Sequence, residues 1–250
     1  MEDRDLYRGF VNHEELVSFR VVVKETDVFI QACTDLSDLA REIILECRGH
    51  LESYIEQYPD VAKTLMPWEE TGPAPEIVRE MVRAGRTAGV GPMAAVAGAV
   101  AEIVGRGLLK YSDRVVVENG GDIFYHLDGK ITAGIFAGLS PLSMKVGIVI
   151  DGREGPVSLC TSSGTVGHSK SFGRADAVCV MAGSCALADA AATSIANRIF
   201  SKSDIGDAIE FGRSIHGIGG IVGIKDDGIG VWGDMEVVPL GGHGPARKKG

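Results

Sequence analysis

Four consecutive residues, Asn119, Gly120, Gly121 and Asp122, end a run of β-branched residues and have the chemistry to shape a ligand pocket. Paired glycines let backbone amides approach a ligand closely. An Asp122 carboxylate beside exposed N–H groups can fix a ligand hydroxyl or amine. The same four residues between two strands also form plain hairpin turns, and the pattern alone favours that simpler interpretation.

A carboxylate and a hydroxyl, Asp189 and Thr193, lie four residues apart in an Ala-rich segment. On a helix this spacing places both oxygens on one face, one turn apart. With water and phosphate oxygens, such a pair suits Mg²⁺, which needs hard oxygen ligands and takes few from the protein. The spacing also arises by chance, and Thr193 can instead bond a carbonyl of the preceding turn.

A third polar segment follows a predicted strand. Ser163 and Gly164 end that strand, and a Gly/Ser-rich stretch with His168 comes next. Hydroxyls, glycines and a histidine suit contacts with phosphate or carbonyl groups, and a polar surface loop is the equally supported alternative. His168 is the best placed of the six histidines. The Gly-x-x-x-x-Gly-Lys-Ser/Thr, Gly-x-Ser-x-Gly and His-Glu-x-x-His motifs are absent from the sequence.

Hydrophobic periodicity and turn residues predict the elements that hold these side chains. Helices are predicted over Leu36–Tyr58, Glu76–Ala88, Met93–Val104, Ser184–Phe200 and Asp204–Ser214. Strands are predicted over Val17–Val23, Thr26–Ala32, Arg114–Glu118, Asp122–Leu127, Ile131–Phe136, Val146–Asp151, Val157–Cys160 and Ala177–Met181, with a closing meander over Ile218–Ile224, Gly228–Trp232 and Glu236–Leu240. The small residues of the third helix favour tight packing, with a flat ligand as the alternative.

This order of elements predicts an α+β fold, a mixed α/β sandwich, rather than alternating βαβ units. We expect one domain over residues 1–240 and a flexible C-terminal tail over residues 241–250. Each half has a strand block next to a helix, so the pattern also allows an internal duplication. The glycine-rich strand edges suggest contacts within a homo-oligomer of undefined size.

Composition excludes several classes of protein. The 250 residues carry a formal net charge of -9, which argues against general affinity for nucleic acid or an anionic membrane. The five cysteines form no Cys-x-x-Cys pair and are expected to be reduced, mostly buried thiols. The sequence shows neither a signal peptide nor an apolar run long enough to span a bilayer. We therefore expect a cytoplasmic protein with neither a nucleic-acid nor a membrane partner.

Taken in order, these pieces resemble the ApbE family of FAD-dependent flavin transferases. Asn119-Gly120-Gly121-Asp122 looks like its glycine turn, Ser163-Gly164 like its Ser-Gly element, and Ala188–Thr193 like its metal-binding helix. The resemblance covers roughly Leu36 to Ile199 and implies an ApbE-like, T-fold-like architecture. Ala97 and Glu102 stand where the family has lysine and aspartate, the His-Ile-x-Asp-Pro loop is missing, and the lipoprotein signal is absent. The chain thus looks like a short cytoplasmic branch of the superfamily.

The family transfers FMN from FAD to a protein threonine, releases AMP and requires Mg²⁺. The resemblance implies that Asp189 and Thr193 hold the metal and that Asp189 and His168 are catalytic. It implies that a flavin-nucleotide pocket is formed by Glu102, Asn119, Gly120, Gly121, Asp122, Ser163, Gly164 and His168. The expected partners are FAD and a protein acceptor, or water, which gives FAD hydrolysis to FMN and AMP. Two alternatives stay open: a non-catalytic flavin or nucleotide binder, which the lost lysine favours, and a different small-molecule enzyme on the same scaffold.

Overall fold

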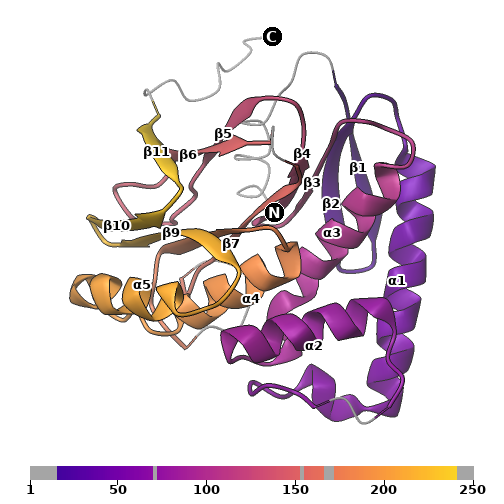
Figure 1. The fold of residues 1–250 in the computed structure, drawn as a ribbon, viewed down its shortest axis with the longest axis horizontal. Coiled ribbons are helices and arrows are strands. Elements are labelled where there is room, and N and C mark those ends of the chain that lie inside the picture. Colours follow the sequence, from indigo (N-terminus) through magenta and orange to yellow (C-terminus); the bar gives the residue numbers. More distant parts are fainter. Residues whose placement is uncertain (1–15, 70–71, 153–154, 166–171, 241–250) are drawn as a thin grey trace.

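Two antiparallel sheets form the frame of the protein, a computed structural model that describes residues 16–69, 72–152, 155–165 and 172–240. The large sheet contains β1 (Val17–Val23), β2 (Thr26–Ala32), β3 (Val115–Asn119), β4 (Asp122–His126), β7 (Val157–Ser162), β8 (Ala177–Ala182), β9 (Ile218–Lys225) and β10 (Gly228–Gly233), in that spatial order. The small sheet contains β11 (Glu236–Pro239), β6 (Val146–Asp151) and β5 (Lys130–Gly134), in that order. Every pairing between the described strands is antiparallel. Figure 1 shows where these elements lie.

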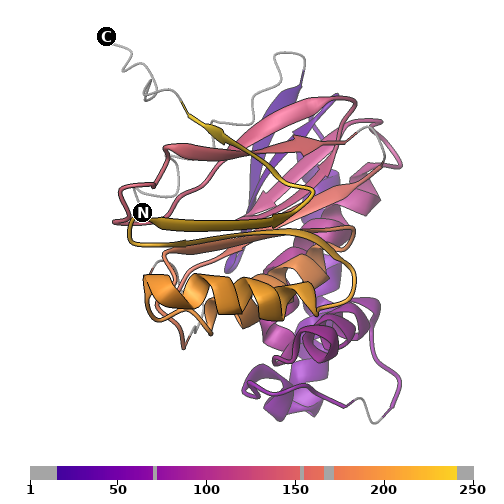
Figure 2. The same cartoon turned by 60° about the vertical axis from the view of Figure 1, so that its left-hand side comes forward.

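The helices cover one face of the large sheet, and the small sheet covers part of the other (Figure 2). The α-helices are α1 (Ser37–Gln57), α2 (Glu76–Ala88), α3 (Val96–Leu108), α4 (Cys185–Ala196) and α5 (Ile205–Arg213), with 3-10 turns at η1 (Pro59–Ala62), η2 (Pro92–Ala95) and η3 (Lys202–Asp204). The strands alternate their side chains between two hydrophobic cores. Val117 and Phe124 belong to the helix-side core, whereas Val116 and Tyr125 belong to the core between the sheets. Burial on both faces explains why the start of β3 is continuously apolar.

The α+β prediction is confirmed, and most predicted elements agree with the structure within a few residues. Two differences affect the architecture. The predicted helix at Met93 begins as the 3-10 turn η2, and the α-helix continues to Leu108. The predicted C-terminal meander was wrong in its last strand, because β11 pairs with β6 instead of β10. Gly233 makes this redirection possible, since its φ of 86° suits a sharp turn away from β10.

Residues 241–250, predicted as a flexible tail, lie outside the described residues. The internal duplication stays a prediction. All five cysteines are free, and four of them are buried, as expected from their apolar neighbours. Among the described helices, none alone has the length and apolar composition of a membrane span. The segments α2 and η2–α3 reach that length and composition together, but the chain bends by 104° between them.

Candidate active site

The glycine turn is a tight hairpin that joins β3 to β4. Asn119 pairs with Asp122 across the turn, and Gly120 adopts a φ of 72°. The hairpin interpretation is therefore confirmed. Its two polar side chains, however, point to the helix layer: Asn119 Nδ2 donates to the Ala97 carbonyl of α3 over 3.0 Å. Asp122 is only 5% exposed, so its carboxylate lies inside the protein and not at an open turn as predicted.

Gly121 lets a neighbouring strand approach the hairpin. A Cβ at this position would lie 2.9 Å from the carbonyl oxygen of Thr161 in β7. The Thr161 amide also donates to the Gly121 carbonyl over 3.0 Å. Strand packing thus accounts for this glycine without any ligand.

The predicted metal-binding pair lies on α4, where α4 packs against both α3 and the sheet. Asp189 Oδ2 accepts a hydrogen bond of 2.9 Å from the Gly98 amide in the first turn of α3. Thr193 Oγ1 lies 3.3 Å from the Ser162 hydroxyl at the end of β7, so this contact joins α4 to the sheet. Gly98 is required for the close approach, since a Cβ there would lie 2.3 Å from the Cys185 carbonyl oxygen. The tight helix packing favoured for this Ala/Gly-rich helix is therefore confirmed.

The carboxylate of Asp122 on β4 is close enough to that of Asp189 on α4 to affect its pKa. Burial raises the pKa of Asp122 to about 7, partly offset by hydrogen bonds with the Cys160 thiol and the Thr161 backbone. Burial, and then the charge of Asp122, hold the pKa of Asp189 well above its ordinary value, against the effect of the Gly98 and Ala97 amides. Asp122 Oδ1 is buried and has no hydrogen-bond partner within the described residues. The site therefore favours a proton or a cation over two bare negative charges.

These donors fit a magnesium ion that arrives with a phosphate-bearing ligand. Asp189, Thr193 and the open oxygen of Asp122 are hard oxygen donors, as Mg²⁺ requires. Within the described ranges, no group of three or more His, Cys, Asp or Glu side chains has the geometry of a metal site. The protein would thus supply only part of the coordination shell, and ligand oxygens and water would supply the rest.

Glu102, predicted as a nucleotide-holding acid, holds the start of α4 in this structure. Its Oε2 accepts hydrogen bonds from the Cys185 amide at 2.8 Å and the Ser184 hydroxyl at 3.2 Å. Its Oε1 pairs with Arg106 at 2.7 Å. A carboxylate is stabilised at a helix N-terminus, where free amides and the helix dipole meet. The structure therefore gives Glu102 a helix-capping position between α3 and α4.

The Ser-Gly element lies at the other end of α4. The Gly164 amide donates to the Ala175 carbonyl over 2.9 Å, and a Cβ on Gly164 would lie 2.2 Å from the Gly173 carbonyl oxygen. The Ser163 hydroxyl donates to the Ala175 carbonyl over 3.4 Å. This segment folds back on itself beside the last turn of α4. His168 lies outside the described residues.

Sequence reasoning missed two residues of β7 that belong to this site. Cys160 pairs with Asp122 in the sheet register and faces the helices, and Ser162 contacts Thr193. The predicted strand stopped at Cys160, whereas β7 continues to Ser162. The period of two along a strand was the signal, because it places residues 158, 160 and 162 on one face.

Comparison with known sequences finds a matching family model and similar proteins in archaea. Residues 8–210 match the sequence model of the family "AbpE bacteria". A UPF0280 protein of Methanosarcina acetivorans is 40% identical over 200 residues, which cover 79% of each chain. A UPF0280 protein of Methanococcus aeolicus is 36% identical over 226 residues, which cover 88% of this chain and 91% of the relative.

Comparison with solved structures gives the fold. The flavin transferase ApbE from Vibrio cholerae superposes with a TM-score of 0.57 at 14% identity, covering 88% of this chain and 97% of that chain. The flavinyl transferase ApbE of Pseudomonas stutzeri, in its apo form, gives a TM-score of 0.56 at 11% identity, covering 87% of this chain and 94% of that chain. The expected ApbE-like architecture is therefore confirmed, and the chain belongs to the AbpE bacteria family, within the fold of the ApbE flavin transferases.

Proposed function

We propose that this protein processes FAD in a Mg²⁺-dependent reaction, either by transferring FMN to a protein acceptor or by hydrolysing FAD to FMN and AMP. The observation that supports it most is the carboxylate pair: burial raises the pKa of both Asp122 and Asp189, and Asp122 Oδ1 is buried without a partner in the described part of the chain. A divalent cation would relieve both. The ApbE fold adds the flavin nucleotide as the ligand class.

Asp189 and Thr193 would hold the cation, and Asp122 would face it through its open oxygen. The cation would neutralise diphosphate charge and assist the departure of AMP. The chain itself fixes the donors: the Gly98 amide orients Asp189, and Ser162 orients the hydroxyl of Thr193. His168 and Ser163 are proposed to line the nucleotide side of the pocket.

A specific observation favours a second candidate, a flavin or nucleotide binder without turnover. Ala97 replaces the lysine expected in the family, and Glu102 is engaged in capping α4 and pairing with Arg106. Two groups that would contact the nucleotide are therefore missing or occupied. A binder without turnover would need the metal-holding residues if its ligand carries a diphosphate, and would not need them otherwise.

The test is incubation of the purified protein with FAD and Mg²⁺, with and without EDTA, followed by chromatographic separation of FAD, FMN and AMP. Asp189→Asn is the site variant, because asparagine keeps an oxygen for the Gly98 amide but loses the charge. Asp207→Asn, an exposed carboxylate on α5, is the matched control. The proposal expects AMP and FMN from the parent and the control with Mg²⁺ only.

The other outcomes separate the candidates. FAD that binds in a Mg²⁺-dependent way but stays intact overturns turnover and supports the binder. FAD that neither binds nor reacts overturns both flavin functions and leaves a different small-molecule enzyme on this scaffold. Processing that is unchanged in Asp189→Asn would show that the metal site is elsewhere.

A further inference from the structure

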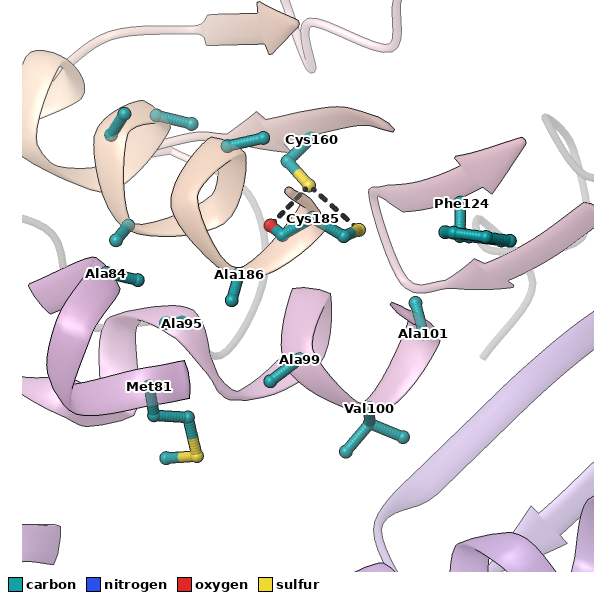
Figure 3. Close-up of a cluster of buried hydrophobic side chains, with 14 of the residues drawn as sticks. Met81, Ala84, Ala95, Ala99, Val100, Ala101, Phe124, Cys160, Cys185 and Ala186 are labelled. Atoms are coloured by element: carbon teal, nitrogen blue, oxygen red, sulfur yellow. Dashed lines mark hydrogen bonds between the residues drawn. The ribbon is translucent and has the colours of Figure 1, made fainter. Parts of the chain in front are cut away.

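Two buried thiols touch each other where β7 meets the start of α4. Cys160 Sγ lies 3.5 Å from Cys185 Sγ and 3.3 Å from the Cys185 carbonyl oxygen, as the dashed lines in Figure 3 mark. Both side chains are 0% exposed. Cys179, on the next strand, belongs to the core between the sheets and contacts Thr161 instead. All five cysteines are described, and this is the pair whose sulfur atoms are in contact.

Their sulfur atoms are in contact but not bonded. An S–S bond measures about 2.05 Å, so the two sulfur atoms need to approach by about 1.5 Å. We propose that Cys160 and Cys185 form a redox-active dithiol, a modification site that hydroperoxides convert to a disulfide between β7 and α4.

The reaction balances with hydrogen peroxide as the only co-reactant. One sulfur attacks a peroxide oxygen, the O–O bond breaks, a sulfenic acid forms, and the other peroxide oxygen leaves as water. The second sulfur attacks that sulfur, the S–O bond breaks, and a second water leaves. The two sulfurs are oxidised by two electrons in total, the peroxide is reduced, and the two thiol protons end in the water molecules. An external dithiol restores both thiols by exchange.

Access to the pair is controlled by the first turn of α4. Both thiols are 0% exposed, so the closed structure keeps peroxide away from them. Glu102 holds that turn through the Cys185 amide and the Ser184 hydroxyl. Oxidation therefore proceeds from local opening of this turn. Weakening the Glu102 contacts should raise the oxidation rate.

The disulfide would also change the geometry of the candidate active site. Cys160 lies opposite Asp122 in the sheet register, and Cys185 lies one turn before Asp189. Drawing the sulfur atoms together shifts the start of α4 relative to β4 and removes the thiol that hydrogen-bonds to Asp122. This inference does not rest on the flavin function, since it concerns only the chain's own sulfurs.

The test is treatment of the folded protein with hydrogen peroxide, then denaturation, alkylation of free thiols and peptide mapping by mass spectrometry. We expect a Cys160–Cys185 linked peptide that dithiothreitol removes and that Cys160→Ser lacks. Glu102→Gln should form the link roughly tenfold faster, as expected for the loss of about 1.4 kcal/mol in a charge-assisted contact. Glu80→Gln, a carboxylate paired with Arg83 on the α2 surface, is the matched control and should match the parent.

The proposal is overturned if Cys160 and Cys185 stay fully alkylatable after the more exposed Cys33 has been oxidised. It is also overturned if the parent forms its link through another cysteine, or if Glu102→Gln and Glu80→Gln react at the parent's rate. The first two outcomes are measured on the parent, so they do not depend on whether a variant folds.

Discussion

Asp189 accepts a hydrogen bond from the backbone amide of Gly98, so the residue predicted to bind a metal also holds the first turn of α3. The two roles are compatible because the contact uses Oδ2 of the carboxylate. They have different consequences for mutation. A change that removes only the charge affects cation binding, whereas a change that removes the oxygen also frees a helix amide.

This separation gives the first prediction. In EDTA, Asp189→Ala should be less stable than Asp189→Asn by about 1 kcal/mol, as for the loss of a helix cap. Mg²⁺ should raise the unfolding free energy of the parent, and this increment should grow with the logarithm of the free Mg²⁺ concentration above the dissociation constant. Both variants should lose this increment. Urea unfolding with and without Mg²⁺ measures both effects. If Asp189→Asn retained the parent's Mg²⁺ increment, Asp189 would not be a ligand.

The raised pKa of Asp122 predicts how stability depends on pH. The folded state keeps a proton on this carboxyl up to about pH 7, whereas the unfolded chain releases it near its ordinary value of 3.8. The folded state therefore binds more protons in this window, and stability in EDTA should fall as pH rises from about 4 to 7. The pKa of Asp189 is raised too and acts in the same direction.

The check is urea unfolding in EDTA at a series of pH values. Asp122→Asn should flatten the decline across this window, and the exposed Asp207→Asn should leave it as in the parent. Added Mg²⁺ should stabilise the parent more above pH 7 than below it, because the cation competes with protons for the carboxylates. A decline of equal slope in the parent and Asp122→Asn would contradict the assignment.

Gly98 provides a prediction about packing. A Cβ at Gly98 would lie 2.3 Å from the Cys185 carbonyl oxygen and 2.9 Å from Asp189 Cβ, so Gly98→Ala must push α3 from α4. We expect a loss of about 1–3 kcal/mol in unfolding free energy, together with weaker Mg²⁺ binding. Gly49 of α1 has open space around it, so Gly49→Ala should instead stabilise by about 0.5–1 kcal/mol. Equal effects of the two changes on denaturant midpoints would contradict the close helix contact.

The sequence predicted what local patterns determine. Helix periodicity placed α2 correctly from Glu76 to Ala88, and the Asn-Gly-Gly-Asp pattern correctly predicted a hairpin. The same local logic placed Asp189 and Thr193 on one helix. These features depend on neighbours a few positions away, where turn and helix geometry leave few choices.

Contacts between distant segments were not predictable in this way. The pairing of β11 with β6 joins residues far apart in the chain, and the hydrophobic pattern of β11 would fit either sheet. The burial of Asp122 follows from α3 and α4 packing over the hairpin, which a turn motif cannot show. Glu102 looked free for a ligand because its partners, Ser184 and Cys185, lie in another helix.

Ser162 provides the last prediction, because it contacts the proposed metal-binding hydroxyl of Thr193 over 3.3 Å. An accepting partner directs the lone pairs of a ligating group to the metal, and loss of such partners typically weakens metal affinity about 10- to 100-fold. Ser162→Ala should weaken Mg²⁺ binding by this factor, and Ser162→Thr should restore most of it. Isothermal titration with Mg²⁺ measures the affinity.

Ser158 offers a control on the same face of β7. Its hydroxyl is 0% exposed and has no hydrogen-bond partner among the residues that the structure describes. Ser158→Ala should therefore leave Mg²⁺ affinity unchanged and be neutral or stabilising, since it removes an unsatisfied buried group. If Ser162→Ala also left Mg²⁺ affinity unchanged while Asp189→Asn abolished binding, Thr193 would serve only to pack α4 against β7, and the cation would depend on the carboxylates alone.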